Sequence, residues 1–154
     1  MTKLKFGDIA RDKITGFQGV VVARTIWLNN CDRLLLQPRE VKDGKPLDGR
    51  SFDEPNLEFV ETTDIKVFKV ARPDEKVVLG DIVRDVISNL SGVAIARTEW
   101  MNGCSRVTVQ PKELKDGLPV ESSTFDESDL QIVTRAIPPK PRETGGPRPE
   151  PARR

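Results

Sequence analysis

The strongest constraint on the fold of this chain is an internal repeat. Residues 7–60 align with residues 80–133 at a constant offset of 73, without a gap, and 27 of the 54 aligned pairs are identical. Self-similarity on this scale indicates duplication of one structural unit. We refer to the two copies as the first and the second repeat. Positions kept in both face a shared constraint, which is either folding or function.

Each repeat has the pattern of a short β-meander. A helical period of 3.6 residues is absent, β-branched residues fill the ordered runs, and Gly and Pro interrupt them often. In the first repeat we predict strands at about 8–12, 19–28, 31–37 and 57–60, with a two-residue hairpin turn at Asn29-Asn30. We therefore expect a mostly β protein, folded as two tandem SH3-like small barrels with short helical turns.

One helical turn is predicted before the last strand of each repeat. Ser51-Phe52-Asp53-Glu54 and Thr124-Phe125-Asp126-Glu127 match the capping-box pattern, in which the glutamate binds back to the start of the turn.

The chain divides into four predicted parts. Residues 1–60 form the first module, 61–79 a linker, 80–133 the second module and 134–154 a tail rich in Pro and Arg. The linker contains an alternating run, Ile65–Val70, that predicts a strand. The tail is predicted to be disordered when unbound, either as a docking segment or as a solubilising end.

The charge of the chain is unevenly distributed. From Thr134 on, six cations and two anions give a net charge of +4, which leaves −3 for the rest of a chain of net charge +1. A body of net charge −3 is not typical of a strong general nucleic-acid binder.

The composition argues against most enzyme chemistry. The chain has no histidine and two cysteines, Cys31 and Cys104, which excludes histidine general bases, Ser/His and Cys/His nucleophile systems and the usual zinc ligand sets. We predict a non-enzymatic protein without cofactors and with reduced cysteines, although a disulfide between the copies stays open.

No apolar run approaches the roughly 18–20 residues of a membrane span, and no secretory leader is present, so we expect a cytosolic protein without membrane contact.

The predicted hairpin assigns its side chains to two faces. If Asn29-Asn30 is a two-residue turn, Trp27 opposes Asp32, and directly opposed residues point to the same side of a sheet. One side is then mostly apolar and predicted to face the core. In the first repeat it carries Ala23, Thr25, Trp27, Leu34 and Leu36.

The other side of the hairpin carries our candidate binding site. It would bring together on an open face two arginines and one glutamine that both repeats keep: Arg24, Arg33, Gln37, Arg97, Arg106 and Gln110. Guanidinium groups bind phosphate or carboxylate through paired hydrogen bonds. The alternative is that each arginine pairs with a nearby Asp or Glu. Trp27 and Trp100 complete the candidate set, as core residues or as rings that stack on a base.

Two aspartates lie in the first predicted strand of each repeat. Asp8 and Asp12 in the first repeat, and Asp81 and Asp85 in the second, are interpreted as a solvated strand edge, because Arg11 and Arg84 lie among them.

The motif GD-x-x-RD-x-I-TGF-x-G, followed by NGC-x-R, QP, DG and FDE, resembles small proteins of bacteriophages and prophages that have compact SH3- or KOW-type barrels. The resemblance covers both repeats, 108 of 154 residues, although each repeat departs from the motif somewhere. It implies a phage-encoded binding or adaptor protein that acts through paired barrel faces on a host or viral partner, in the cytoplasm of the bacterial host. A protein partner is the first expectation, and homo-oligomers stay open. The alternatives are a virion structural or decoration protein, a sponge for a nucleotide-derived immune signal that binds phosphate, and a nucleic-acid-binding protein.

Overall fold

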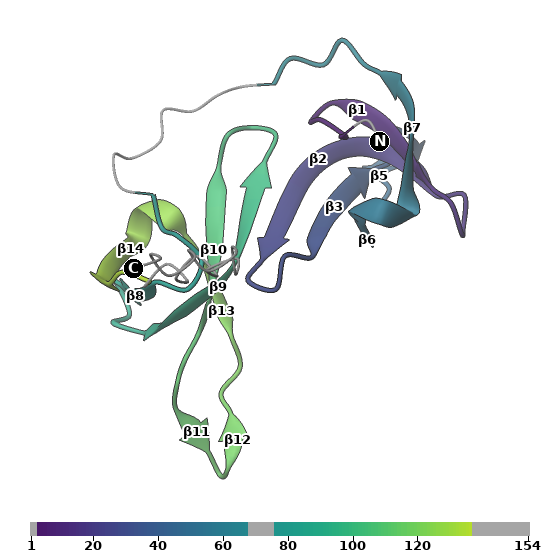
Figure 1. Ribbon diagram of the computed structural model, residues 1–154. Helices are drawn as coiled ribbons and strands as arrows, with labels where there is room; N and C mark the ends of the chain where they lie inside the picture. Colours follow the sequence, from purple (N-terminus) through teal and green to yellow (C-terminus); the bar gives the residue numbers. More distant parts are fainter. Residues whose placement is uncertain (1–2, 68–75, 137–154) are drawn as a thin grey trace, which may run out of the picture.

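The computed structural model describes residues 3–67 and 76–136, in which every element of the first repeat has a counterpart in the second (Figure 1). The first repeat contains β1 (Asp8–Asp12), β2 (Gln18–Trp27), β3 (Asp32–Gln37), β4 (Val41–Lys42), β5 (Lys45–Pro46), β6 (Arg50–Asp53), the 3-10 helix η1 (Glu54–Asn56) and β7 (Leu57–Thr62). The second contains β8 (Ile82–Asp85), β9 (Ser91–Trp100), β10 (Ser105–Gln110), β11 (Leu114–Lys115), β12 (Leu118–Pro119), β13 (Ser123–Asp126), η2 (Glu127–Asp129) and β14 (Leu130–Thr134). The predictions of a mostly β chain and of a helical turn before the last strand are confirmed.

The strands of each repeat form an open antiparallel sheet. The order is β6-β3-β2-β1-β7 in the first repeat and β13-β10-β9-β8-β14 in the second. Among the described strands the edges β6 and β7 do not pair with each other, and neither do β13 and β14, so the sheets do not close into the predicted barrels. The hairpins β4–β5 and β11–β12 are separate two-stranded sheets, and β11–β12 projects away from the body (Figure 1).

The two repeats are joined by an antiparallel ladder between β2 and β9. Its central pair is Thr25 with Thr98, which are equivalent positions, and the Oγ1 atoms of the two threonines lie 2.9 Å apart. Trp27 pairs with Ala96, and Ala23 pairs with Trp100, which repeats the same contact with the copies exchanged. The junction therefore has a local two-fold axis through the threonine pair, and it merges both repeats into one ten-stranded sheet.

A β-bulge in each long strand supports this junction. The β2–β3 register skips Val22, and the β9–β10 register skips the equivalent Ile95. The carbonyl of each bulged residue accepts a hydrogen bond from the other repeat: Leu28 N donates to Ile95 O at 2.8 Å, and Met101 N donates to Val22 O at 2.7 Å. Since a bulge bends its strand and redirects its groups, β2 can pair with β1 in its first half and with β9 in its second.

Both hydrophobic cores lie on the same side of the merged sheet. Leu34 is paired with Arg24, and Arg24 is paired with Glu99 across the β2–β9 ladder. Glu99 and Arg97 are two residues apart on β9 and therefore share a side, and Arg97 is paired with Val107. Directly paired side chains share a face, so Leu34 and Val107 point to one side of the sheet. The two buried clusters there consist of Leu4, Ala10, Val21, Leu34, Leu36 and Leu57, and of Val77, Val83, Ala94, Val107 and Val109.

The linker and the tail are covered only in part. The predicted strand at Ile65–Val70 is not seen at residues 65–67, and residues 68–70 lie outside the described residues, as does the tail from residue 137. Within residues 3–67 and 76–136, no helix is long and apolar enough to cross a membrane.

Candidate functional site

The β2–β3 hairpin has a three-residue loop, and the predicted two-residue turn is wrong. Ile26 rather than Trp27 pairs with Asp32, and Asn30 N donates to Trp27 O at 2.9 Å. Asn30 adopts a positive φ of 64°, and the equivalent Gly103 one of 88°. This is the geometry of a turn followed by one left-handed residue, which Asn and Gly tolerate. A shift of one residue moves every side chain of β2 to the opposite face relative to β3.

The shift separates the arginines that were predicted to lie together. Arg24 and Arg97 point to the core side and are buried, with 9% and 5% of their surface exposed. Arg33 and Arg106 lie on the opposite, open side and are about half exposed. The predicted common face of Arg24, Arg33 and Gln37 is therefore wrong.

Each buried arginine links two segments of its own repeat to the segment that precedes the repeat. Arg24 donates to Glu54 at 2.8 and 3.1 Å, to Asp32 at 3.0 Å and to the carbonyl of Leu4 at 3.0 Å.

The equivalent Arg97 repeats the arrangement with a more deeply buried carboxylate. It donates to Glu127 at 2.6 and 2.8 Å, to the Ser105 hydroxyl at 3.1 Å and to the carbonyl of Val77. Burial disfavours the Glu127 carboxylate, but hydrogen bonds from Arg97 and from Val77 N outweigh it and lower the pKa of Glu127. The predicted capping boxes are wrong, because Asp53 and Asp126 make no side-chain cap bond and the glutamates bind the arginines instead.

The two predicted glutamines hold loops. Gln37 Nε2 donates to Leu47 O at 2.5 Å, and Gln110 Nε2 donates to Val120 O at 2.6 Å. Both amides thereby fix the segments that follow the small hairpins β4–β5 and β11–β12. Their amide groups are engaged locally and do not extend the open surface around Arg33 and Arg106.

A row of six side chains crosses the open side of the merged sheet. Consecutive ladder pairs place these residues side by side on six neighbouring strands, and each half of the row repeats the other in reverse order. The row is Asp53, Arg33, Thr25, Thr98, Arg106 and Asp126. Together with Trp27, Trp100, Ala23 and Ala96 we call this surface the shared face.

The tryptophans lie on the shared face, and their predicted place on the core side is wrong. Trp27 is directly opposite Ala96 and Trp100 is opposite Ala23; both alanines are buried, whereas both indoles are partly exposed. Trp27 also lines an open depression of about 350 Å³ together with Leu28, Asn29 and Ile95.

Exposed ion pairs flank the centre of the shared face. Arg33 Nε lies 3.0 Å from Asp53 Oδ1, and Arg106 Nε lies 2.9 Å from Asp126 Oδ1. All four side chains are about half exposed, and ion pairs of this kind contribute little to stability. Folding therefore gives little reason for both repeats to keep the same Arg and Asp here.

The four aspartates near β1 and β8 are buried, and their interpretation as a solvated edge is wrong. Asp12 Oδ2 accepts hydrogen bonds from Thr15 N at 2.8 Å and from Thr15 Oγ1 at 2.6 Å, and Asp85 does the same with Ser88 at 2.7 and 2.6 Å. These bonds, the hydroxyl bond first, lower the pKa of Asp12 and Asp85. Asp12 and Asp85 thereby hold the turns that follow the first strands.

These lowered pKa values predict a loss of stability in acid. A carboxyl group whose pKa is lower in the folded than in the unfolded state stabilises the fold above its ordinary pKa of 3.8. That contribution is lost as the pH falls below this value and through the folded pKa. We expect the melting temperature to drop steeply below about pH 4, and Thr15→Ala with Ser88→Ala to make the drop shallower. Equal acid sensitivity of the wild type and the double variant, measured by thermal melts from neutral to strongly acidic pH, would contradict this assignment.

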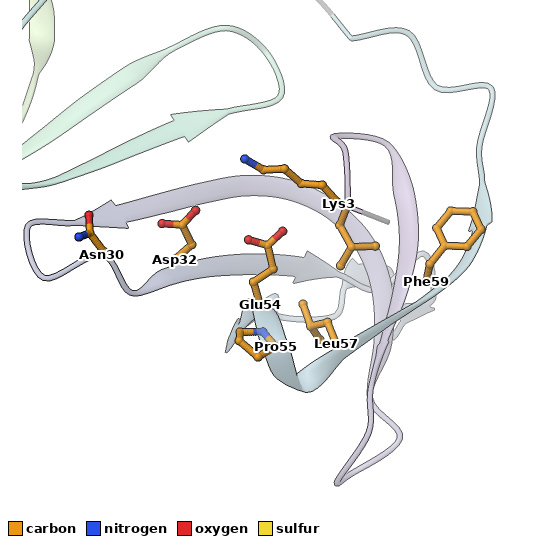
Figure 2. A pocket seen from close by; sticks show the side chains of 8 residues that line it. Lys3, Asn30, Asp32, Glu54, Pro55, Leu57 and Phe59 are labelled. Carbon is orange, nitrogen blue, oxygen red and sulfur yellow. The ribbon is translucent and has the colours of Figure 1, made fainter. Parts of the chain in front are cut away.

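A pocket of about 450 Å³ in the first repeat is a second candidate (Figure 2). Asp32, Glu54 and Lys3 surround it above an apolar wall that includes Leu57 and Phe59. Both carboxylates are already bound to Arg24. The pocket therefore borders the ion-pair cluster of Arg24, and its two carboxylates are already paired with a cation.

Neither the cysteines nor the comparisons with known proteins point to a function. Cys31 and Cys104 are both unpaired and exposed. The described part of the chain contains no group of three or more side chains suited to hold a metal ion. Comparison of the chain with protein-family models, curated proteins and solved structures gave no match.

Proposed function

We propose that this is a non-enzymatic binding protein and that the shared face is its working surface. A phage-encoded adaptor that holds a host or viral partner is the role we favour. The observation that carries the proposal is the symmetric row from Asp53 to Asp126, which the β2–β9 ladder assembles from equivalent residues of both repeats.

The composition of the shared face supports a role in binding. Each position of the row, and also the tryptophan and alanine positions, has the same residue type in both repeats. The exposed Arg–Asp pairs among them add little to stability. Exposed arginine and tryptophan are the residue types that most often dominate the energy of binding.

The position of the cores also supports it. Both hydrophobic clusters lie on the other side of the sheet, so a partner can cover the shared face without disturbing either of them. The lack of histidine, the residue that most often acts as general acid or base, supports binding rather than catalysis.

Affinity capture with matched arginine variants tests the proposal. The full chain is immobilised and exposed to extract of phage-infected bacteria, and the retained proteins, nucleic acids and small molecules are identified by mass spectrometry and sequencing. Arg33→Ala with Arg106→Ala is expected to lower recovery of the partner about tenfold or more, since it removes two exposed anchors.

The control removes two arginines elsewhere on the sheet. Arg11 and Arg84 are equivalent, exposed and hydrogen-bonded to Glu58 and Gln131, and their replacement by alanine should leave recovery unchanged. Equal losses with both double variants, or no species retained above an unrelated bait, would refute the proposal.

A further inference from the structure

The symmetry of the shared face limits what can occupy its centre. Thr25 and Thr98 lie on either side of the local two-fold axis, and every residue of the row on one side has an equivalent on the other. A single ligand that uses both halves equally must itself have two equivalent halves.

The charges of the row favour an anionic ligand at the centre. The arginines stand next to the threonines, and the aspartates stand on the outer strands β6 and β13, so cations alone flank the axis. Arg33 and Arg106 are three strand spacings apart, about 14 Å between Cα atoms. Because a guanidinium reaches several ångströms from its backbone, the two can converge on groups between them. To bind such a group, each arginine has to give up only its exposed ion pair with Asp53 or Asp126.

The tryptophans supply two flat surfaces that are separated along the strand direction, across the line that joins the two arginines. Trp27 lies opposite Ala96, and Trp100 lies four residues further along β9, so their Cα atoms are also about 14 Å apart. A partly exposed indole is a stacking surface for a nucleobase.

The floor between the two arginines is polar. The two threonine hydroxyls share one hydrogen bond, which leaves one proton to donate and lone pairs to accept. An area about 14 Å across suits a small molecule, whereas a protein interface usually covers roughly 800 Å² on each partner.

We infer that the shared face binds one cyclic dinucleotide, a two-fold-symmetric ligand with two phosphates and two bases. Arg33 and Arg106 bind the phosphates, Trp27 and Trp100 stack on the bases, and Thr25 and Thr98 lie beneath the ring. This inference rests on the proposed function, because it uses the same shared face, and it replaces the favoured protein partner by a small ligand.

Calorimetric titration of the full chain tests it, with cyclic di-GMP and cyclic di-AMP as probes and GTP, ATP and inorganic phosphate as comparisons. We expect one cyclic dinucleotide per chain, bound more tightly than any mononucleotide. Arg33→Ala and Arg106→Ala should each weaken binding by about tenfold or more, to a similar extent, and the double variant should abolish it. Arg11→Ala with Arg84→Ala should bind as the wild type does.

Several results would overturn the inference. They are no binding of either cyclic dinucleotide at about 1 mM, unequal effects of the two single variants, binding that survives the double variant, or equal affinity for GTP or ATP. If these occur while affinity capture still recovers a partner that depends on Arg33 and Arg106, the proposed function stands and its ligand is of another class.

Discussion

Arg97→Ala is expected to lower the free energy of unfolding by about 3–5 kcal/mol, because it leaves the Glu127 carboxylate buried without its partner. Both side chains of the pair are only 5% exposed. The substitution also removes the donor to the carbonyl of Val77, so the segment before β8 keeps only the direct bond from Val77 N to Glu127 of η2. Chemical denaturation followed by tryptophan fluorescence measures the change.

Two arginine variants serve as internal controls for Arg97→Ala. Arg106→Ala removes an exposed pair and should cost no more than about 1 kcal/mol. Arg24→Ala removes the equivalent of Arg97 in the first repeat, where the carboxylates of Asp32 and Glu54 are 28% and 23% exposed and can be solvated. We expect an intermediate loss there. Equal effects of Arg97→Ala and Arg106→Ala would show that burial does not set the importance of these pairs.

Leu34→Ala is expected to destabilise the protein by about 2–5 kcal/mol. Leu34 has no exposed surface and belongs to the buried cluster of the first repeat. Truncation of its side chain leaves a cavity in this cluster, because the neighbouring side chains can relax only in part to fill it.

Leu35→Ala is the matched control for Leu34→Ala. Leu35 is the next residue of β3, has the same side chain and points to the opposite, open side of the sheet, where it is partly exposed. We expect its replacement to cost clearly less than that of Leu34. Similar losses for the two variants would mean that β3 does not turn Leu34 to the core and Leu35 to the open side.

The one-residue difference in the hairpin shows where prediction from the sequence failed. Asn29-Asn30 and Asn102-Gly103 are compatible with a two-residue or a three-residue loop, since both place a residue that tolerates positive φ at the turn. The choice between the two loop lengths depends on which side chains of β2 can be buried on the core side of the sheet. Arg24 belongs there because Glu54 and the carbonyl of Leu4 lie within reach, and these groups are 30 and 20 residues away in the chain.

One sequence signal for this cluster was overlooked. Arg24 and Glu54 recur as Arg97 and Glu127 with the same spacing of 30 residues. A pair of opposite charges kept at equal spacing in both repeats indicates an ion pair, and it competes with the capping-box interpretation of the glutamates.

Local patterns in the sequence were sufficient for the repeat, the β-strands, the 3-10 turn before the last strand and Arg33 and Arg106 as exposed arginines. These features depend on neighbouring residues, on strand periodicity or on side-chain polarity. The tertiary structure decided the hairpin register, the burial of Arg24 and Arg97, and the pairing of β2 with β9 across 73 residues. These features depend on contacts between segments that are far apart in the sequence. A local sequence pattern does not contain the energies of such contacts. The shared face exists only because Thr25 meets Thr98 in the folded chain.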